Sequence, residues 1–163
     1  MTCSTLPRKN SETSVGMAQI AVVQQGEIAR AVLGSCIGLV LMHEHRRIAA
    51  VAHIVLPQGQ GRPGPAGKFA DTAIPEMLLM LGDQGISRIG ISAKLVGGAN
   101  MFSSSGPLQI GRENHAVVKS LLQELRIPIV GEHVGGKVGR RMTFDSATGE
   151  LHIEMAGSPS VTI

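Results

Sequence analysis

The sequence predicts a single-domain α/β sandwich, with a mixed and largely antiparallel β-sheet packed against two main helices. Two observations carry this prediction. Short apolar runs of strand length precede and separate two longer amphipathic segments, and turns rich in glycine or proline divide them. The chain has 163 residues, 43% of them hydrophobic and 17% charged, which suits one domain with its own core. Strands before and between helices favour helices that pack on a sheet.

Four apolar runs follow an N-terminal segment rich in serine and threonine. We expect residues 1–16 to be a disordered leader and residues 17–163 to form the folded domain. The four expected strands are 17–24, 27–33, 36–42 and 48–56. Both faces of 36–42 are apolar, as expected of a strand that is covered on both sides.

Helices and strands alternate in the rest of the chain. A Gly/Pro loop over 57–68 leads into a helix over 71–84, with Asp71 or Thr72 as its N-cap and Gly85 as its end. The remaining expected elements are a strand over 88–96, a helix over 111–126, a strand over 127–134, and a hairpin of 141–145 with 150–155.

The charge pattern limits the classes of partner. The formal charge is +3, but the basic residues occur in pairs rather than tracts, and no aromatic residues lie between them. This argues against nucleic acid and favours an acidic protein partner. No apolar run reaches the roughly 18 residues of a membrane span, so we expect a cytoplasmic protein.

Histidines make a metal site worth testing. His43 and His45 flank Glu44 in an expected turn, but no third ligand lies at a recognised spacing. We therefore expect neither a metal nor a cofactor.

Cys36 and His53 are the candidate catalytic pair. If the strands around them form a hairpin that turns about Glu44 and His45, the two residues are directly opposed, with Cβ atoms about 4.5–5.5 Å apart. An adjacent imidazolium would then lower the pKa of the thiol, and main-chain amides near Cys36 would serve as oxyanion donors. The alternative from the residues alone is a small buried hydrophobe and a hydrogen-bonded histidine without a catalytic role.

Several sequence blocks resemble those of one family. LGSCIGLVL is followed by RRIAAVAHIVLP, and then in order by GKFADTAI, KLVGGANMF, IGRENHAVV and FDSATGEL. In this order and spacing, from about Glu27 to Ile153, they resemble the CheD family of chemoreceptor glutamine deamidases.

The resemblance implies a function and its residues. Cys36 matches the nucleophile of the family and His53 its base, with no metal. The implied reaction converts glutamines on the cytoplasmic helices of methyl-accepting chemotaxis receptors to glutamate through a thioester. It also implies a CheC-type phosphatase as partner, and the alternative function is a non-catalytic regulator that binds this phosphatase.

Two positions depart from the family pattern. Members can carry a threonine six residues before the nucleophile as a third catalytic group, whereas this chain has Arg30. A guanidinium only donates hydrogen bonds, so it cannot accept one from the imidazole. The two alternatives are a weaker activity in this chain and a backbone carbonyl that replaces the third group. The chain also has His133 and Val134 where an acidic residue and threonine are more familiar, which bears on substrate fit.

Overall fold

The computed structural model describes residues 11–101 and 109–163. The strands in these ranges are β1 (Glu12–Ser14), β2 (Ile20–Gln24), β3 (Ile28–Leu33), β4 (Ile37–His43), β5 (Ile48–Ile54), β6 (Ile91–Gly97), β7 (Ile129–Val134), β8 (Arg140–Asp145), β9 (Leu151–Glu154) and β10 (Val161–Thr162). The helices there are α1 (Ala70–Asp83) and α2 (Ile110–Glu124), and a 3-10 turn covers Ala66–Lys68.

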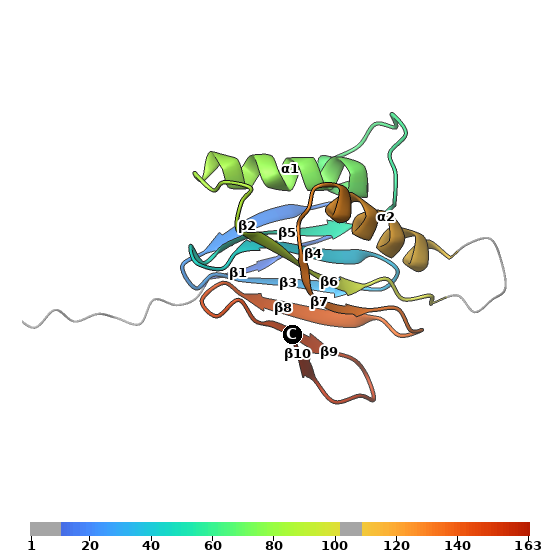
Figure 1. The fold of residues 1–163 in the computed structure, drawn as a ribbon. Helices are drawn as coiled ribbons and strands as arrows, with labels where there is room; N and C mark the ends of the chain where they lie inside the picture. The colour runs from blue at the N-terminus through green and yellow to red at the C-terminus, as the bar shows by residue number, and fades with distance from the viewer. Residues whose placement is uncertain (1–10, 102–108) are drawn as a thin grey trace, which may run out of the picture.

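The strands form two sheets that pack face to face. Sheet A has the order β1-β3-β8-β9-β10, and sheet B has the order β2-β5-β4-β6-β7. The pairs β1–β3 and β6–β7 are parallel, and the other pairs are antiparallel. Both helices lie over the outer face of sheet B, with sheet A on its other side (Figure 1). The predicted α/β sandwich of mixed, largely antiparallel sheet is confirmed.

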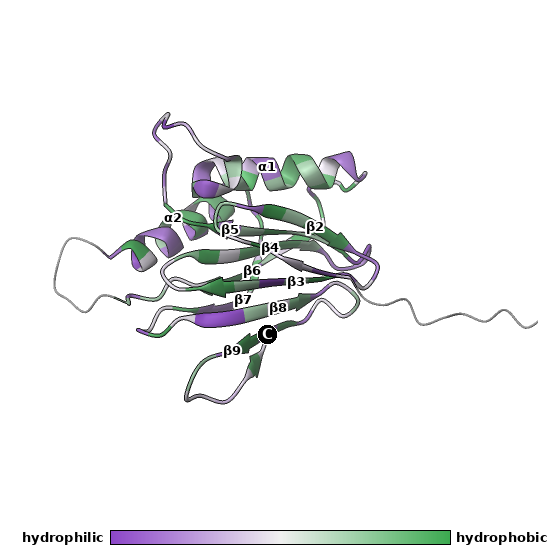
Figure 2. Cartoon of the chain, turned by 180° about the vertical axis from the view of Figure 1, so that it is seen from behind, coloured by the Kyte–Doolittle hydropathy of each residue, from purple (hydrophilic) through white to green (hydrophobic). Residues whose placement is uncertain are grey.

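Sheet B is covered on both faces. Successive residues of β4 belong to different cores, because successive side chains of a strand point to opposite faces. Ile37, Leu39 and Leu41 pack in the core under the helices, whereas Val40 and Met42 pack in the core between the sheets. The central strands are accordingly hydrophobic along their length (Figure 2), which agrees with the prediction for residues 36–42.

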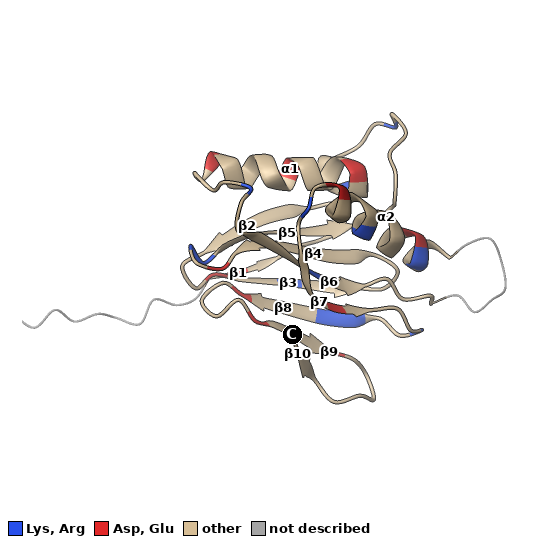
Figure 3. Cartoon of the chain, viewed as in Figure 1, with Lys and Arg blue, Asp and Glu red and all other residues tan. Residues whose placement is uncertain are grey.

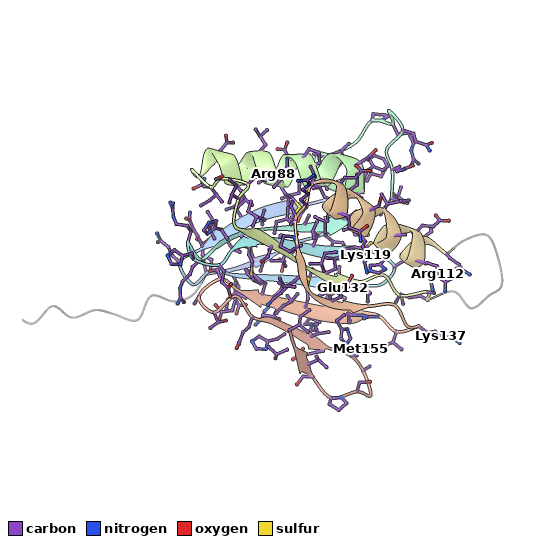
Figure 4. The ribbon with its side chains drawn as sticks, viewed as in Figure 1. Arg88, Arg112, Lys119, Glu132, Lys137 and Met155 are labelled. Atoms are coloured by element: carbon purple, nitrogen blue, oxygen red, sulfur yellow. The ribbon has the colours of Figure 1, made fainter. Side chains whose placement is uncertain are left out.

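Two polar contacts of Glu132 join α2 to the edge strand β7. The carboxylate of Glu132 contacts His115 Nε2 at 2.9 Å and Lys119 Nζ at 3.6 Å. Lys119 and Glu132 are both labelled in Figure 4. The hydrogen bond with His115 lowers the pKa of Glu132 below its ordinary value, and the charge of Lys119 adds to this effect. The two contacts bring this part of α2 against β7.

The start of α1 differs from the prediction. Phe69 occupies the N-cap position and makes no side-chain cap bond. Asp71 instead accepts a hydrogen bond from Gly59 N at 3.0 Å, and Thr72 donates to Ala66 O at 2.6 Å. Both side chains therefore tie the preceding loop to the helix rather than capping it. Gly85, at φ 77°, follows the helix as expected.

Two short strands were not predicted. β1 pairs with β3, so the expected leader over 1–16 is wrong for Glu12–Ser14; residues 1–10 lie outside the described part of the chain. β10 pairs with β9 at the far edge of sheet A. Each strand is short and exposed, so neither carries an apolar pattern. The other boundaries agree within about three residues.

The buried face of α1 predicts a difference between two leucines. Leu81 is fully buried against sheet B, whereas Leu79 is 61% exposed. We expect Leu81→Ala to lower the free energy of unfolding by about 2–5 kcal/mol, because it leaves a cavity. Leu79→Ala is the matched control in the same helix and should change it by less than about 0.5 kcal/mol. Urea denaturation measures both, and equal losses would contradict the packing of α1.

Candidate active site

The register of β4 and β5 places the candidate pair diagonally. Gly38 is the residue directly opposite His53, and Ile37 opposes Ile54. The predicted direct opposition of Cys36 and His53 is therefore wrong by two residues. A shift of two keeps a side chain on its face, so both residues remain on the side of sheet B that faces sheet A. Diagonal neighbours lie roughly 7–8 Å apart, farther than directly opposed residues.

A main-chain carbonyl orients the imidazole of His53. His53 is 4% exposed, and its Nδ1 lies 2.9 Å from Val15 O. A carbonyl oxygen only accepts, so Nδ1 carries a hydrogen, and in the neutral ring Nε2 is then the nitrogen with the lone pair. The nitrogen of neutral His53 that can accept a proton is therefore Nε2. Val15 O is thus a backbone carbonyl in contact with the imidazole of His53.

Arg30 contributes through its main chain. Its carbonyl oxygen accepts a hydrogen bond from Val15 N at 2.7 Å, so β3 holds the residue that orients His53. The guanidinium lies on the outer face of sheet A, where it pairs with Glu12 at 3.1 Å. The Arg30 side chain is thus engaged by a carboxylate, and the imidazole is oriented by Val15.

Backbone hydrogen bonds hold the turn that carries Cys36. Gly98 N donates to Cys36 O at 2.9 Å, and Ala99 N donates to Gly34 O at 3.0 Å. The Cys36 side chain is 8% exposed. Burial raises the pKa of the Cys36 thiol above its ordinary value, which is the opposite of the expected lowering by an imidazolium. In the described part of the chain, no hydrogen bond joins the thiol to His53.

A groove opens beside His53. Its volume is about 540 Å³, and its lining comprises Ser14, Val15, Gly16, Met17, Arg30, Ala31, Val32, His53 and Arg141. Met17 and Val32 are 69% and 70% exposed, so part of the rim is apolar. His53 thus lines the groove, while Cys36 lies outside its lining. A larger hollow of about 1020 Å³ surrounds Lys94 and Ile163, and neither member of the pair lines it.

A buried arginine shapes the loop after β7. Arg140 is 3% exposed and donates hydrogen bonds to Nδ1 and O of His133, both at 2.9 Å, and to Gly135 O. Asn100 N donates to Gly136 O at 2.9 Å. This end of β8 is strongly basic (Figure 3). His133 therefore holds Arg140 in place. The pKa of His133 is lowered by burial and by the guanidinium of Arg140.

Three contributors to this region were not predicted. Val15 acts through its carbonyl, and Arg140 was considered only as part of a basic pair. Asn114 is fully buried and donates to Ser35 O at 3.1 Å and Val55 O at 2.9 Å. A sequence signal for Asn114 existed, because it lies on the buried stripe of α2 that also includes Val118 and is the polar member of that stripe.

The close contact at Gly97 predicts a further difference between matched variants. Gly97 has φ 108°, and a Cβ there would overlap Cys36 O. Gly85 has φ 77° and open space around its Cβ position. Gly85→Ala should cost about 1–2 kcal/mol for the left-handed backbone alone. Gly97→Ala should cost about 1–3 kcal/mol more, because the turn must shift. Denaturant unfolding compares them, and similar costs would contradict the contact.

No helix within the described residues combines the length and the apolar character needed to cross a membrane. Within the same residues, no cluster of three or more His, Cys, Asp or Glu side chains is placed to hold a metal ion. His43 Nδ1 instead receives a hydrogen bond from Arg46 N at 3.2 Å.

Comparison with known proteins identifies the family. The model for CheD chemotactic sensory transduction matches residues 55–155. A probable chemoreceptor glutamine deamidase CheD of Moorella thermoacetica is 41% identical over 159 residues, covering 93% of this chain and 95% of the relative. The chemoreceptor glutamine deamidase CheD of Halalkalibacterium halodurans is 40% identical over 151 residues, covering 88% of this chain and 93% of the relative. With this identity along nearly its whole length and a matching family model, the chain belongs to the CheD family.

Proposed function

We propose that this chain hydrolyses glutamine side chains of methyl-accepting chemotaxis receptors to glutamate, with Cys36 as nucleophile and His53 as its base. Family membership supports the reaction, because the relatives are named chemoreceptor glutamine deamidases. The observation that carries the mechanism is the Val15 O–His53 Nδ1 hydrogen bond. It leaves Nε2 as the proton acceptor on the side of the sheet that Cys36 also occupies.

The cycle forms a thioester in its first stage and hydrolyses it in its second. As the Cys36 sulfur attacks the carboxamide carbon, the thiol proton passes to His53 Nε2, and main-chain amides near Cys36 stabilise the oxyanion. The C–N bond then breaks, His53 returns the proton to the departing ammonia, and a thioester remains. Water hydrolyses the thioester with His53 again as base, which leaves a glutamate side chain on the receptor and restores the thiol. No cofactor or metal takes part in this scheme.

The burial of the Cys36 thiol decides which role His53 has in the proposed mechanism. Its raised pKa favours the neutral form, so His53 acts as a general base during attack rather than as a preformed imidazolium partner. Because Cys36 is 8% exposed, the receptor glutamine must displace neighbouring side chains to reach it. The substrate helices lie on the cytoplasmic parts of receptors, so the proposed place of action is the cytoplasm.

Binding without catalysis is the second candidate. A protein that regulates a CheC-type phosphatase by contact does not need a reactive thiol, and the burial of Cys36 favours this reading. The exposed apolar side chains of Met17 and Val32 offer a surface for a protein partner.

Variants of the pair predict the outcome of a deamidation assay. With a receptor cytoplasmic fragment as substrate, the parent protein should release ammonia and convert glutamine to glutamate, as seen by mass spectrometry. Cys36→Ala should lower kcat by at least about a thousandfold, and His53→Gln by about a hundredfold or more. The sequence has one other cysteine, Cys3, so Cys3→Ser is the matched cysteine control and should keep full activity.

Each result separates the two candidates. Undiminished deamidation by Cys36→Ala would exclude the thioester mechanism. If the parent protein releases no ammonia, yet it and Cys36→Ala stimulate the phosphatase equally, the chain acts by binding.

Burial of the thiol predicts its reactivity with iodoacetamide. A raised pKa means that the thiolate forms only at higher pH, so Cys36 of the substrate-free protein should react more slowly near neutral pH than an ordinary cysteine. The same residue in urea-unfolded protein is the control and should titrate normally. Peptide mapping separates Cys36 from Cys3. A thiolate that persists well below about pH 8 in the folded protein would contradict this effect of burial.

A further inference from the structure

Asn114 bridges the two segments that carry the candidate pair. Its side chain on α2 is fully buried, and its amide nitrogen lies 3.1 Å from Ser35 O and 2.9 Å from Val55 O. Ser35 directly precedes Cys36, and Val55 follows His53 by two residues. One side-chain amide therefore contacts the chain next to both members of the pair.

The bridge lies where the strand ladder ends. Ile37 and Ile54 are the last paired residues of β4 and β5 at this end. Beyond them Val55 N donates to Lys68 O at 3.0 Å instead of to β4. The two strands are thus no longer joined directly, and Asn114 supplies the link between them.

The chemistry of the link selects asparagine. A primary amide has two N–H donors on one nitrogen, which suits two carbonyl acceptors, whereas a carboxylate has none and a hydroxyl has one. Asn114 Oδ1 is buried and has no hydrogen-bond partner among the described residues. An unpaired buried acceptor lowers the stability of the fold, so Asn114 joins the two segments at some cost in stability.

The same helix also contacts a third segment around Cys36. A Cβ at Gly111 would overlap Gly98 O and Ala99 O, so the first turn of α2 packs directly on that backbone. Gly98 N in turn donates to Cys36 O at 2.9 Å. The helix therefore fixes the Cys36 turn from two sides, through Gly111 and through Asn114.

We propose that Asn114 is a positioning residue that sets the distance between Cys36 and His53 by clamping Ser35 and Val55. The proposal rests on the catalytic roles given above to Cys36 and His53. It assigns to Asn114 no contact with substrate. Loss of the clamp lets the two strand ends separate, which lowers the chemical rate and leaves receptor binding nearly intact.

The test is the deamidation assay with Asn114→Ala and Asn114→Ser in the full chain. A misplacement of about 1 Å costs on the order of a hundredfold in rate, so Asn114→Ala should lose about that much in kcat while KM changes by less than about threefold. Asn114→Ser keeps one of the two donors and should retain an intermediate kcat; it also serves as the test variant if the alanine variant does not fold.

Val118→Ala is the matched control. Val118 is fully buried one turn further along α2 and packs in the core under the helices, so its truncation weakens the helix packing without touching the clamp. At a temperature where circular dichroism shows all variants folded, Val118→Ala should keep the parent kcat.

The outcomes distinguish this role from the proposed function. If Cys36→Ala abolishes turnover but the Asn114 variants keep the parent kcat, or lose no more than Val118→Ala, the positioning role is wrong and the mechanism stands. A raised KM with unchanged kcat would also overturn it. If Cys36→Ala stays active, the catalytic pair itself fails, whatever Asn114 does.

Discussion

The burial of sheet B on both faces is the constraint on which the site depends. Helices cover one face and sheet A covers the other, so a shift of β4 by one residue would exchange its two sets of apolar side chains between different cores. This fixes which residues lie between the sheets. Cys36 is an even number of residues from Val40, and His53 is an even number from Val51. Both valines pack in the core between the sheets, so Cys36 and His53 share that side.

Much of the fold was predictable because the order of apolar and polar residues follows the pattern of burial. The central strands, both helices and the β8–β9 hairpin follow from apolar runs and turn residues. The exact pairing of β4 with β5 did not follow, because it depends on the turn. Four residues, 44–47, connect the strands, and Arg47 adopts a positive φ of 51°. Two- and four-residue turns give similar side-chain patterns, and the sequence offers no glycine there to mark the choice.

The sequence suggests Cys36 and His53 as the candidate pair, from their strands and from the family resemblance, and their catalytic roles stay predictions. The contacts that support this region were harder to predict. The edge strand β1, which leads into Val15, is short and polar, so no apolar run in the sequence predicted it. Asn114 was readable as a polar residue on a buried helical stripe, but its partners come from segments far away in the sequence. The burial of the thiol depends on the packing of both sheets and has no local signature.

The hydrogen bond from His53 to Val15 has a consequence for how such proteins vary. A carbonyl oxygen is present whichever amino acid occupies position 15, so no substitution there deletes the acceptor; only a change in the path of the chain would move it. Selection can maintain this contact while the residue itself drifts. An inventory of invariant side chains would therefore miss this contact of the imidazole, because the main chain makes it.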